Sequence, residues 1–241
     1  MRTSFDASGE VLVVTGGANG IGAALARAYA AAGGTSVVLD IAASAELDGV
    51  ERLVQKQVDI ADRDAVLAAV DDVAAEHGAV DALVAGAAVQ PRIEVLEMDP
   101  AVWARTLAVN LDGVVWACQA VLPGMIERRR GSILMFASNL AHAGLAEASA
   151  YAASKGGIIA FGKSLAAEVA RHDVRVNVVF PGIVDTPQFR RANGKGAREQ
   201  WASIGVGEPE DVVGPLMFLL SAEATMTGST LSRDRAYPAR V

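Results

Sequence analysis

Cysteine, long apolar runs and a leader pattern are scarce or missing in this sequence. Cys118 is the only cysteine in 241 residues, so an internal disulfide is excluded and a reducing cytoplasm is the expected compartment. No uninterrupted apolar run reaches the roughly 18–20 residues that a membrane-spanning helix needs, and the N-terminus shows no basic-then-apolar pattern. We therefore expect no membrane attachment.

Excess positive charge and metal-ligand clusters are also missing. The net charge is −7, which argues against nucleic-acid binding. The three histidines, His77, His142 and His172, lie far apart, and no histidines or acids have the spacing of a catalytic metal site. We predict neither a nucleic-acid partner nor a metal.

What the chain does have is an alternation of strand and helix patterns along its whole length. Strands are predicted at 11–15, 36–40, 53–58, 80–85, 131–137 and 174–180, with a short seventh near 229–232. Helices are predicted at 20–32, 62–77, about 99–127, 149–171 and 208–221. This alternation is typical of a doubly wound parallel sheet with helices on both faces. Without a repeat or linker, residues 1–241 form one predicted α/β domain.

A glycine-rich turn follows the first predicted strand. Residues 16–22 read Gly-Gly-Ala-Asn-Gly-Ile-Gly and run into an alanine-rich helix. Glycines between a strand and a helix let the backbone approach a pyrophosphate, and the helix N-terminus offers free N–H groups to it. This context predicts a dinucleotide site, with a tight structural turn as the alternative.

The second predicted strand ends in Asp40. A carboxylate there can accept hydrogen bonds from a ribose diol and repels a 2′-phosphate. Positions 17–19 hold no cation that could receive that phosphate. The sequence favours NAD over NADP, unless Asp40 is only a capping or solvated residue.

Tyr151 and Lys155 lie four residues apart in a predicted helix and so share one face. A nearby cation lowers the pKa of a phenol, and a hydroxyl such as that of Ser138 can bond an oxygen on which charge develops. The trio can polarise a carbonyl and give it a proton. For the tyrosine–lysine pair alone, an exposed amphipathic helix face is the alternative.

Together these segments resemble the short-chain dehydrogenase/reductase family over essentially the whole chain. The resemblance implies a Rossmann-like fold and hydride transfer between a nicotinamide cofactor and a ketone or secondary alcohol. It implies that Ser138, Tyr151, Lys155 and Asn110 are catalytic, with Asn110 anchoring a water that relays protons to Lys155. It also implies a homotetramer, in which the helices at 99–127 and 149–171 pack against their copies.

The resemblance further implies the cofactor contacts, with Asp59 beside the adenine and Thr186 at the nicotinamide carboxamide. The full set of cofactor residues is Gly16, Asn19, Gly20, Ile21, Gly22, Asp40, Asp59, Ile60, Ala85, Gly86, Tyr151, Lys155, Pro181, Gly182, Val184 and Thr186.

Two segments depart from the family pattern. Ala85-Gly86-Ala87-Ala88 stands where Asn-Asn-Ala-Gly is common, and residues 232–236 replace a usual Val-Asp-Gly-Gly. The first change leaves the local hydrogen bonding open, and the second leaves substrate and subunit details open. These departures motivate one alternative, a catalytically weak NAD-binding sensor or scaffold. A separate alternative within the same family is an NADP-dependent 3-oxoacyl reductase, against which Asp40 counts.

The irregular, glycine-containing stretch 184–209 is predicted to be the substrate lid. Its cations Arg190, Arg191, Lys195 and Arg198 could meet an acidic substrate or could simply be solvated. Candidate substrate contacts are Gln90, Asn139, His142, Phe189 and Trp201.

Residues 157–164 match the phosphate-loop expression GxxxxGK[ST]. Both flanks are helical, whereas a phosphate loop must follow a strand. We do not predict a nucleotide triphosphate site there.

Overall fold

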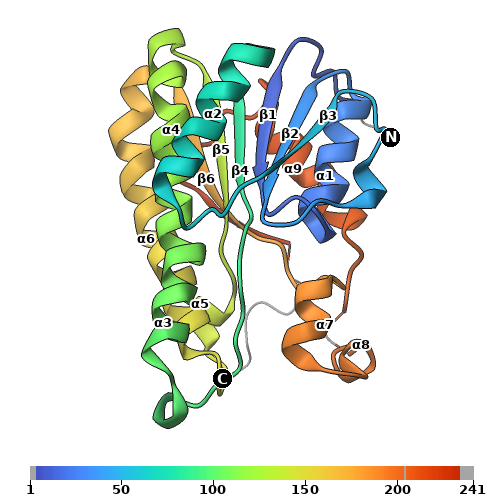
Figure 1. Ribbon diagram of the computed structural model, residues 1–241, viewed down its shortest axis with the longest axis vertical. Coiled ribbons are helices and arrows are strands. Elements are labelled where there is room, and N and C mark those ends of the chain that lie inside the picture. Colours follow the sequence, from blue (N-terminus) through green and yellow to red (C-terminus); the bar gives the residue numbers. More distant parts are fainter. Residues whose placement is uncertain (1–3, 204, 234–241) are drawn as a thin grey trace.

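The computed structural model describes residues 4–203 and 205–233 and contains one parallel seven-stranded sheet (Figure 1). The strands run in the order β3-β2-β1-β4-β5-β6-β7. They are β1 Val11–Thr15, β2 Thr35–Asp40, β3 Leu53–Gln57, β4 Ala82–Ala85, β5 Gly131–Phe136, β6 Val174–Phe180 and β7 Thr230–Ser232. The predicted doubly wound α/β fold is confirmed, and each strand lies within two residues of its predicted bounds.

Helices cover both faces of the sheet, as Figure 1 shows. The long helices α2 Arg63–His77, α4 Gly113–Arg128 and α6 Ser149–Val169 lie on one face, and α1 Gly20–Ala31 and α9 Glu210–Leu220 lie on the other. Successive β1 residues alternate between the two cores: Val13 packs with the first layer, and Leu12 and Val14 pack with the second. This burial on both faces explains why central strands such as β1 and β4 are continuous apolar runs.

The predicted helix at 99–127 is not continuous, so that prediction is wrong in detail. It consists of α3 Pro100–Leu107, a π-helical turn at Ala108–Asp112, and α4. Single π-helical turns of this kind are frequent at functional sites. The turn contains Asn110, whose side chain is fully buried.

The whole stretch Pro100–Arg128 is apolar and long enough to cross a membrane by length and composition. In this fold, however, α4 packs against β4, β5 and α2, and its buried residues include Cys118. Burial raises the pKa of the Cys118 thiol. These contacts are those of a core helix.

The predicted lid is more ordered than the sequence suggested. It holds two short helices, α7 Pro187–Asn193 and α8 Ala197–Gln200, which lie beyond the carboxyl edge of the sheet. The Thr186 hydroxyl caps α7 by accepting from the Phe189 N–H at 3.1 Å, and Pro187 occupies the first turn. The two ends of the lid pair with each other, because Gly207 N–H donates to Ile183 O at 2.9 Å and Asp185 N–H donates to Gly207 O at 2.8 Å.

Backbone contacts compensate for the Ala85–Ala88 departure. The Gly86 N–H donates to both the carbonyl and the hydroxyl oxygen of Thr15, at 3.1 and 3.2 Å. The end of β4 therefore stays tied to β1 without an asparagine side chain.

In the second departure, Arg233 extends β7. Its N–H donates to Phe180 O at 3.1 Å, and its guanidinium contacts Pro181 O at 3.4 Å and Asp211 at 3.3 Å. Residues 234–236 of this segment lie outside the described residues.

The remaining short elements are the four-residue helix α5 Leu140–Ala143 and three 3₁₀ turns at Ala45–Leu47, Val95–Glu97 and Ala170–His172. Residues 157–164 lie wholly inside α6. They therefore form no phosphate loop, as expected.

Candidate functional site

A cavity of about 1230 Å³ opens at the carboxyl edge of the sheet, where the strand order reverses between β1 and β4. Open α/β sheets bind ligands at this kind of switch point. The predicted residues lining the cavity are Gly16, Asn19, Gly20, Ile21, Gly22, Gly86, Gln90, Ser138, Asn139, Tyr151, Lys155, Pro181, Gly182, Val184, Thr186, Phe189 and Trp201. Its size leaves room for part of a dinucleotide and a small substrate together.

The glycine turn has the geometry that a dinucleotide requires. Gly16 has φ +71°, and a Cβ there would lie 2.5 Å from the Ala87 Cα. Gly20 has φ +58°, and its Cβ would lie 3.0 Å from Thr186 Cγ2. The first turn of α1 carries no acidic residue, so its N–H groups present a positive end to an anion. The residues present fit a dinucleotide cofactor.

The acids predicted for the adenosine half lie at the ends of neighbouring strands, outside the lining of the main cavity. Asp40 ends β2 and accepts from Ala18 N–H at 3.0 Å and Ala42 N–H at 3.2 Å. Asp59 follows β3 and is bonded by both terminal nitrogens of Arg105, at 2.9 and 3.1 Å. The Arg105 hydrogen bonds lower the pKa of the Asp59 carboxyl. Ile60 is buried beside Gly113.

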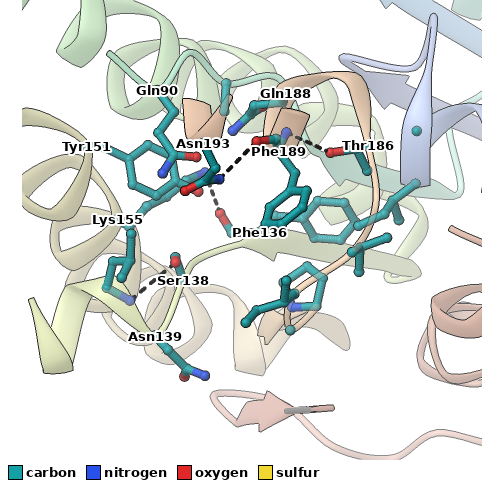
Figure 2. Close-up of a pocket in the computed structure, with 18 of the residues that line it drawn as sticks. Gln90, Phe136, Ser138, Asn139, Tyr151, Lys155, Thr186, Gln188, Phe189 and Asn193 are labelled. Carbon is teal, nitrogen blue, oxygen red and sulfur yellow. Dashed lines mark hydrogen bonds between the residues drawn. The ribbon is translucent and has the colours of Figure 1, made fainter. Parts of the chain in front are cut away.

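Tyr151 and Lys155 lie on the inner face of α6 and are only 8% and 2% exposed. The Lys155 Nζ donates to Phe136 O at 2.7 Å and lies 5.5 Å from the centre of the Tyr151 ring. Ser138, just beyond β5, hydrogen-bonds the Tyr151 phenol. Figure 2 shows these three side chains lining the same cavity.

Burial controls the protonation of this pair. It raises the pKa of Tyr151 to about 12, against a smaller lowering by the Ser138 hydrogen bond. Burial also lowers the pKa of Lys155 to about 7. We expected Lys155 to lower the phenol pKa, and the structure gives the opposite direction for the protein alone, because both groups are withdrawn from water.

Asn110 fastens the loop after β4 to α6. Its Oδ1 accepts from Val89 N–H at 2.8 Å, and its Nδ2 donates to Val89 O at 2.9 Å and to Ser154 Oγ at 3.0 Å. The Ser154 hydroxyl in turn donates to Tyr151 O at 2.7 Å. Sequence reasoning missed Ser154, although its position between Tyr151 and Lys155 was a usable signal.

Among the predicted substrate residues, His142 is misplaced. It is exposed, its ring lies 5.5 Å from the Phe180 ring, and it does not line the cavity. The turn of helix α5 carries it to the outside. The lining residues that were missed include the polar side chains of Gln188 and Asn193, because α7 was not predicted.

Two of the four lid cations are held by the lid's own acids. Asp185, whose side chain is 4% exposed, accepts from Arg190 Nε at 2.6 Å and from Arg198 Nη1 at 2.7 Å. Arg198 also bonds Glu208 at 2.5 Å. The hydrogen bonds from Arg190 and Arg198 lower the pKa of Asp185 to about 2, so this carboxylate is charged at neutral pH. Arg190 and Arg198 are therefore occupied within the lid.

Residues 10–196 match the family model of the short chain dehydrogenases. The chain is a short-chain dehydrogenase. Members of this family transfer a hydride between a nicotinamide cofactor and a small-molecule substrate, and this short-chain dehydrogenase is accordingly an oxidoreductase.

Similar proteins cover nearly the whole short-chain dehydrogenase. D-threitol dehydrogenase of Mycolicibacterium smegmatis is 37% identical, over 97% of this chain and 94% of that protein. A 3-oxoacyl-[acyl-carrier-protein] reductase of Thermotoga maritima is 33% identical, over 94% and 96%. The ligand-free structure of Thermoplasma acidophilum aldohexose dehydrogenase superposes with a TM-score of 0.86 at 30% identity, over 95% of this chain and 93% of that one.

Proposed function

We propose that this enzyme is an NAD-dependent dehydrogenase that interconverts a secondary alcohol and a ketone, with Tyr151 as the acid and base. The observation that carries the proposal is the convergence of Ser138, Tyr151 and Lys155 on a cavity that also holds the glycine turn. A proton donor, a hydroxyl partner and a dinucleotide cradle then face the same substrate carbonyl group, so its oxygen can be protonated while its carbon exchanges a hydride.

Each side chain has a distinct role in this proposal. When bound, the nicotinamide supplies or accepts the hydride at the substrate carbon. Tyr151 gives its phenol proton to the carbonyl oxygen in reduction and takes the proton back in oxidation, while Ser138 orients that oxygen. Lys155 holds the nicotinamide ribose, and Asn110 fixes the loop that faces it. The water relay through Asn110 stays a prediction.

The choice of NAD rests on Asp40, which lies at the end of β2 beside the Ala18 N–H. The second candidate function is an NADP-dependent 3-oxoacyl reductase, which the similarity to the Thermotoga maritima protein favours. A screen of alcohols and ketones with NAD(H) and NADP(H), followed at the absorbance of the reduced nicotinamide, distinguishes the two. A protein that binds NAD but turns over no compound would instead be a sensor or scaffold.

Oxidation is expected to depend on pH more strongly than reduction. Burial raises the pKa of Tyr151 to about 12, so at neutral pH the phenol is protonated and ready to donate, but only a small fraction can accept a proton. We expect kcat/KM for alcohol oxidation to rise about tenfold per pH unit, and so about a hundredfold between about pH 7 and about pH 9, while ketone reduction stays flat or falls. An oxidation rate that does not change across this range contradicts the assignment of Tyr151 as base.

We also propose a homotetramer in which α4 and α6 pack against their copies. Support comes from apolar side chains that the fold leaves partly exposed on these helices, such as Trp116 and Phe161, and from the small residues Ala153 and Gly156. A Cβ at Gly156 would meet nothing within 4 Å, which leaves room for a second helix.

Sedimentation at micromolar concentration should show a tetramer, and Ala153→Glu should shift it to a smaller species. A wild-type monomer would contradict this assembly. The cytoplasm remains the proposed compartment, in keeping with the single buried thiol.

A further inference from the structure

The substrate half of the cavity is polar but uncharged. Of the described residues that line the cavity, Lys155 is the only one with a basic side chain and none carries a carboxylate, and Lys155 is bonded to Phe136 O. A buried carboxylate or phosphate needs a cation or several donors to compensate its lost hydration. Of the four lid cations, Arg190 and Arg198 are bonded to Asp185, and Arg191 and Lys195 do not line the cavity either. The cavity therefore does not suit an anionic substrate.

Besides Asn19 in the glycine turn and Asn139 after β5, three side-chain carboxamides line the cavity, and they come from the loop after β4 and from α7. Gln90 lies in the loop after β4, Gln188 lies in the first turn of α7, and Asn193 ends α7. Figure 2 draws all three together with Tyr151. Each carboxamide both donates and accepts hydrogen bonds, as a hydroxyl does. A substrate with several hydroxyls can thus be bonded in both directions.

These groups are available to a ligand. In the described part of the chain, Gln90 and Gln188 form no side-chain hydrogen bond, and both are half-buried at the cavity wall. The Asn193 Nδ2 donates to Phe189 O, within α7, at 2.9 Å. This bond uses one amide hydrogen of Asn193 and leaves its Oδ1 as an acceptor for a ligand. Binding of an alkyl substrate would remove water from these carboxamides without replacing its hydrogen bonds, and this loss would weaken binding.

Two half-buried aromatic rings, Phe189 and Trp201, supply an apolar wall beside the carboxamides. Ligand sites commonly combine aromatic surface with a few convergent polar groups that fix orientation. A sugar or polyol matches this combination, because it presents hydroxyls along its edges and C–H groups on its faces.

We propose that the substrate is a small, neutral compound with several hydroxyl groups, an aldose or a polyol. Its remaining hydroxyls are recognised by Gln90, Gln188 and Asn193 while one hydroxyl is oxidised at Tyr151. This inference rests on the proposed dehydrogenase function and names the substrate class of the same site.

The test compares three substrate classes with NAD. Neutral aldoses and polyols are set against mono-alcohols of equal carbon number and against sugar acids, and kcat/KM is measured from the absorbance of reduced nicotinamide. We expect the best aldose or polyol to exceed its mono-alcohol match by at least about tenfold, because a site built to bond hydroxyls rejects analogues that lack them. A preference for mono-alcohols or sugar acids overturns the inference and leaves the dehydrogenase function standing. Turnover of no compound overturns both.

A matched pair of variants tests the residues. Gln188→Leu should lower kcat/KM for the preferred polyol about tenfold and leave that for the mono-alcohol nearly unchanged. Gln200→Leu makes the same change in α8 at an exposed position that does not line the cavity, and it should alter neither. Equal effects of Gln188→Leu on both substrates would mean that Gln188 acts only on the structure of the lid, and would refute its part in recognition.

Discussion

Replacing Tyr151 with phenylalanine is expected to lower turnover by about 10²–10⁴-fold, the usual consequence of losing a general acid or base. The ring and its packing on α6 are kept, and the cofactor cradle at residues 16–22 is untouched, so NAD affinity should change little. Turnover is measured in both directions on a substrate found in the screen, and NAD affinity by titration of protein fluorescence.

The same substitution at Tyr29 is the control. Tyr29 lies on α1, is also buried and does not line the cavity. Its phenol donates a hydrogen bond to Glu10 at 3.0 Å. Tyr29→Phe removes an equivalent hydroxyl and should affect stability alone. If Tyr151→Phe turned over at a rate close to that of Tyr29→Phe, the role assigned to Tyr151 would be wrong.

NAD is expected to be preferred over NADP by at least about a hundredfold in kcat/KM. A 2′-phosphate beside Asp40 would meet charge repulsion and would lose the hydrogen bonds of the ribose diol. Each factor of ten corresponds to about 1.4 kcal/mol, so a hundredfold preference requires a difference of about 2.8 kcal/mol between the two cofactors. Wild-type enzyme using both cofactors equally well would require Asp40 to point away from the ribose.

Variants at this position can separate charge from hydrogen bonding. Asp40→Asn removes the charge but retains an oxygen that can accept from the Ala18 N–H, now bonded at 3.0 Å. It should improve use of NADP more than it harms use of NAD. Asp40→Ser combined with Ala18→Arg adds a cation for the phosphate and should reverse the preference. Kinetics with both cofactors check each variant.

The central strands were predictable because each is a short run of residues buried on both faces, such as Val11–Thr15. The π-helical turn at Ala108–Asp112 was not predictable in this way, since its buried Asn110 side chain bonds to Val89, which is distant in sequence. The lid helices were missed for a similar reason. Asp185, which precedes α7, forms ion pairs with Arg190 in α7 and Arg198 in α8. The spacing of apolar residues, on which the helix predictions were based, does not indicate such contacts.

The catalytic candidates followed from helical spacing and family resemblance, which need no knowledge of burial. The protonation of Tyr151 and Lys155 does need it, because α6 is pressed against β6 and the loop after β5. The direction of their pKa shifts was therefore beyond the sequence. His142 failed for a related reason, since one turn of helix decides whether a side chain faces the cavity or solvent.

Gly207 pairs with Ile183 and Asp185, so the two ends of the lid are hydrogen-bonded to each other next to the sheet. The lid is therefore a loop whose ends are fixed. For a loop whose ends are fixed, each doubling of its length adds only about 0.6 kcal/mol of closure entropy. The lid can consequently be lengthened, shortened or exchanged between enzymes at little cost to the strands and to the Tyr151 helix. The segment that we propose to select the substrate is thereby free to change while the proposed catalytic helix stays the same.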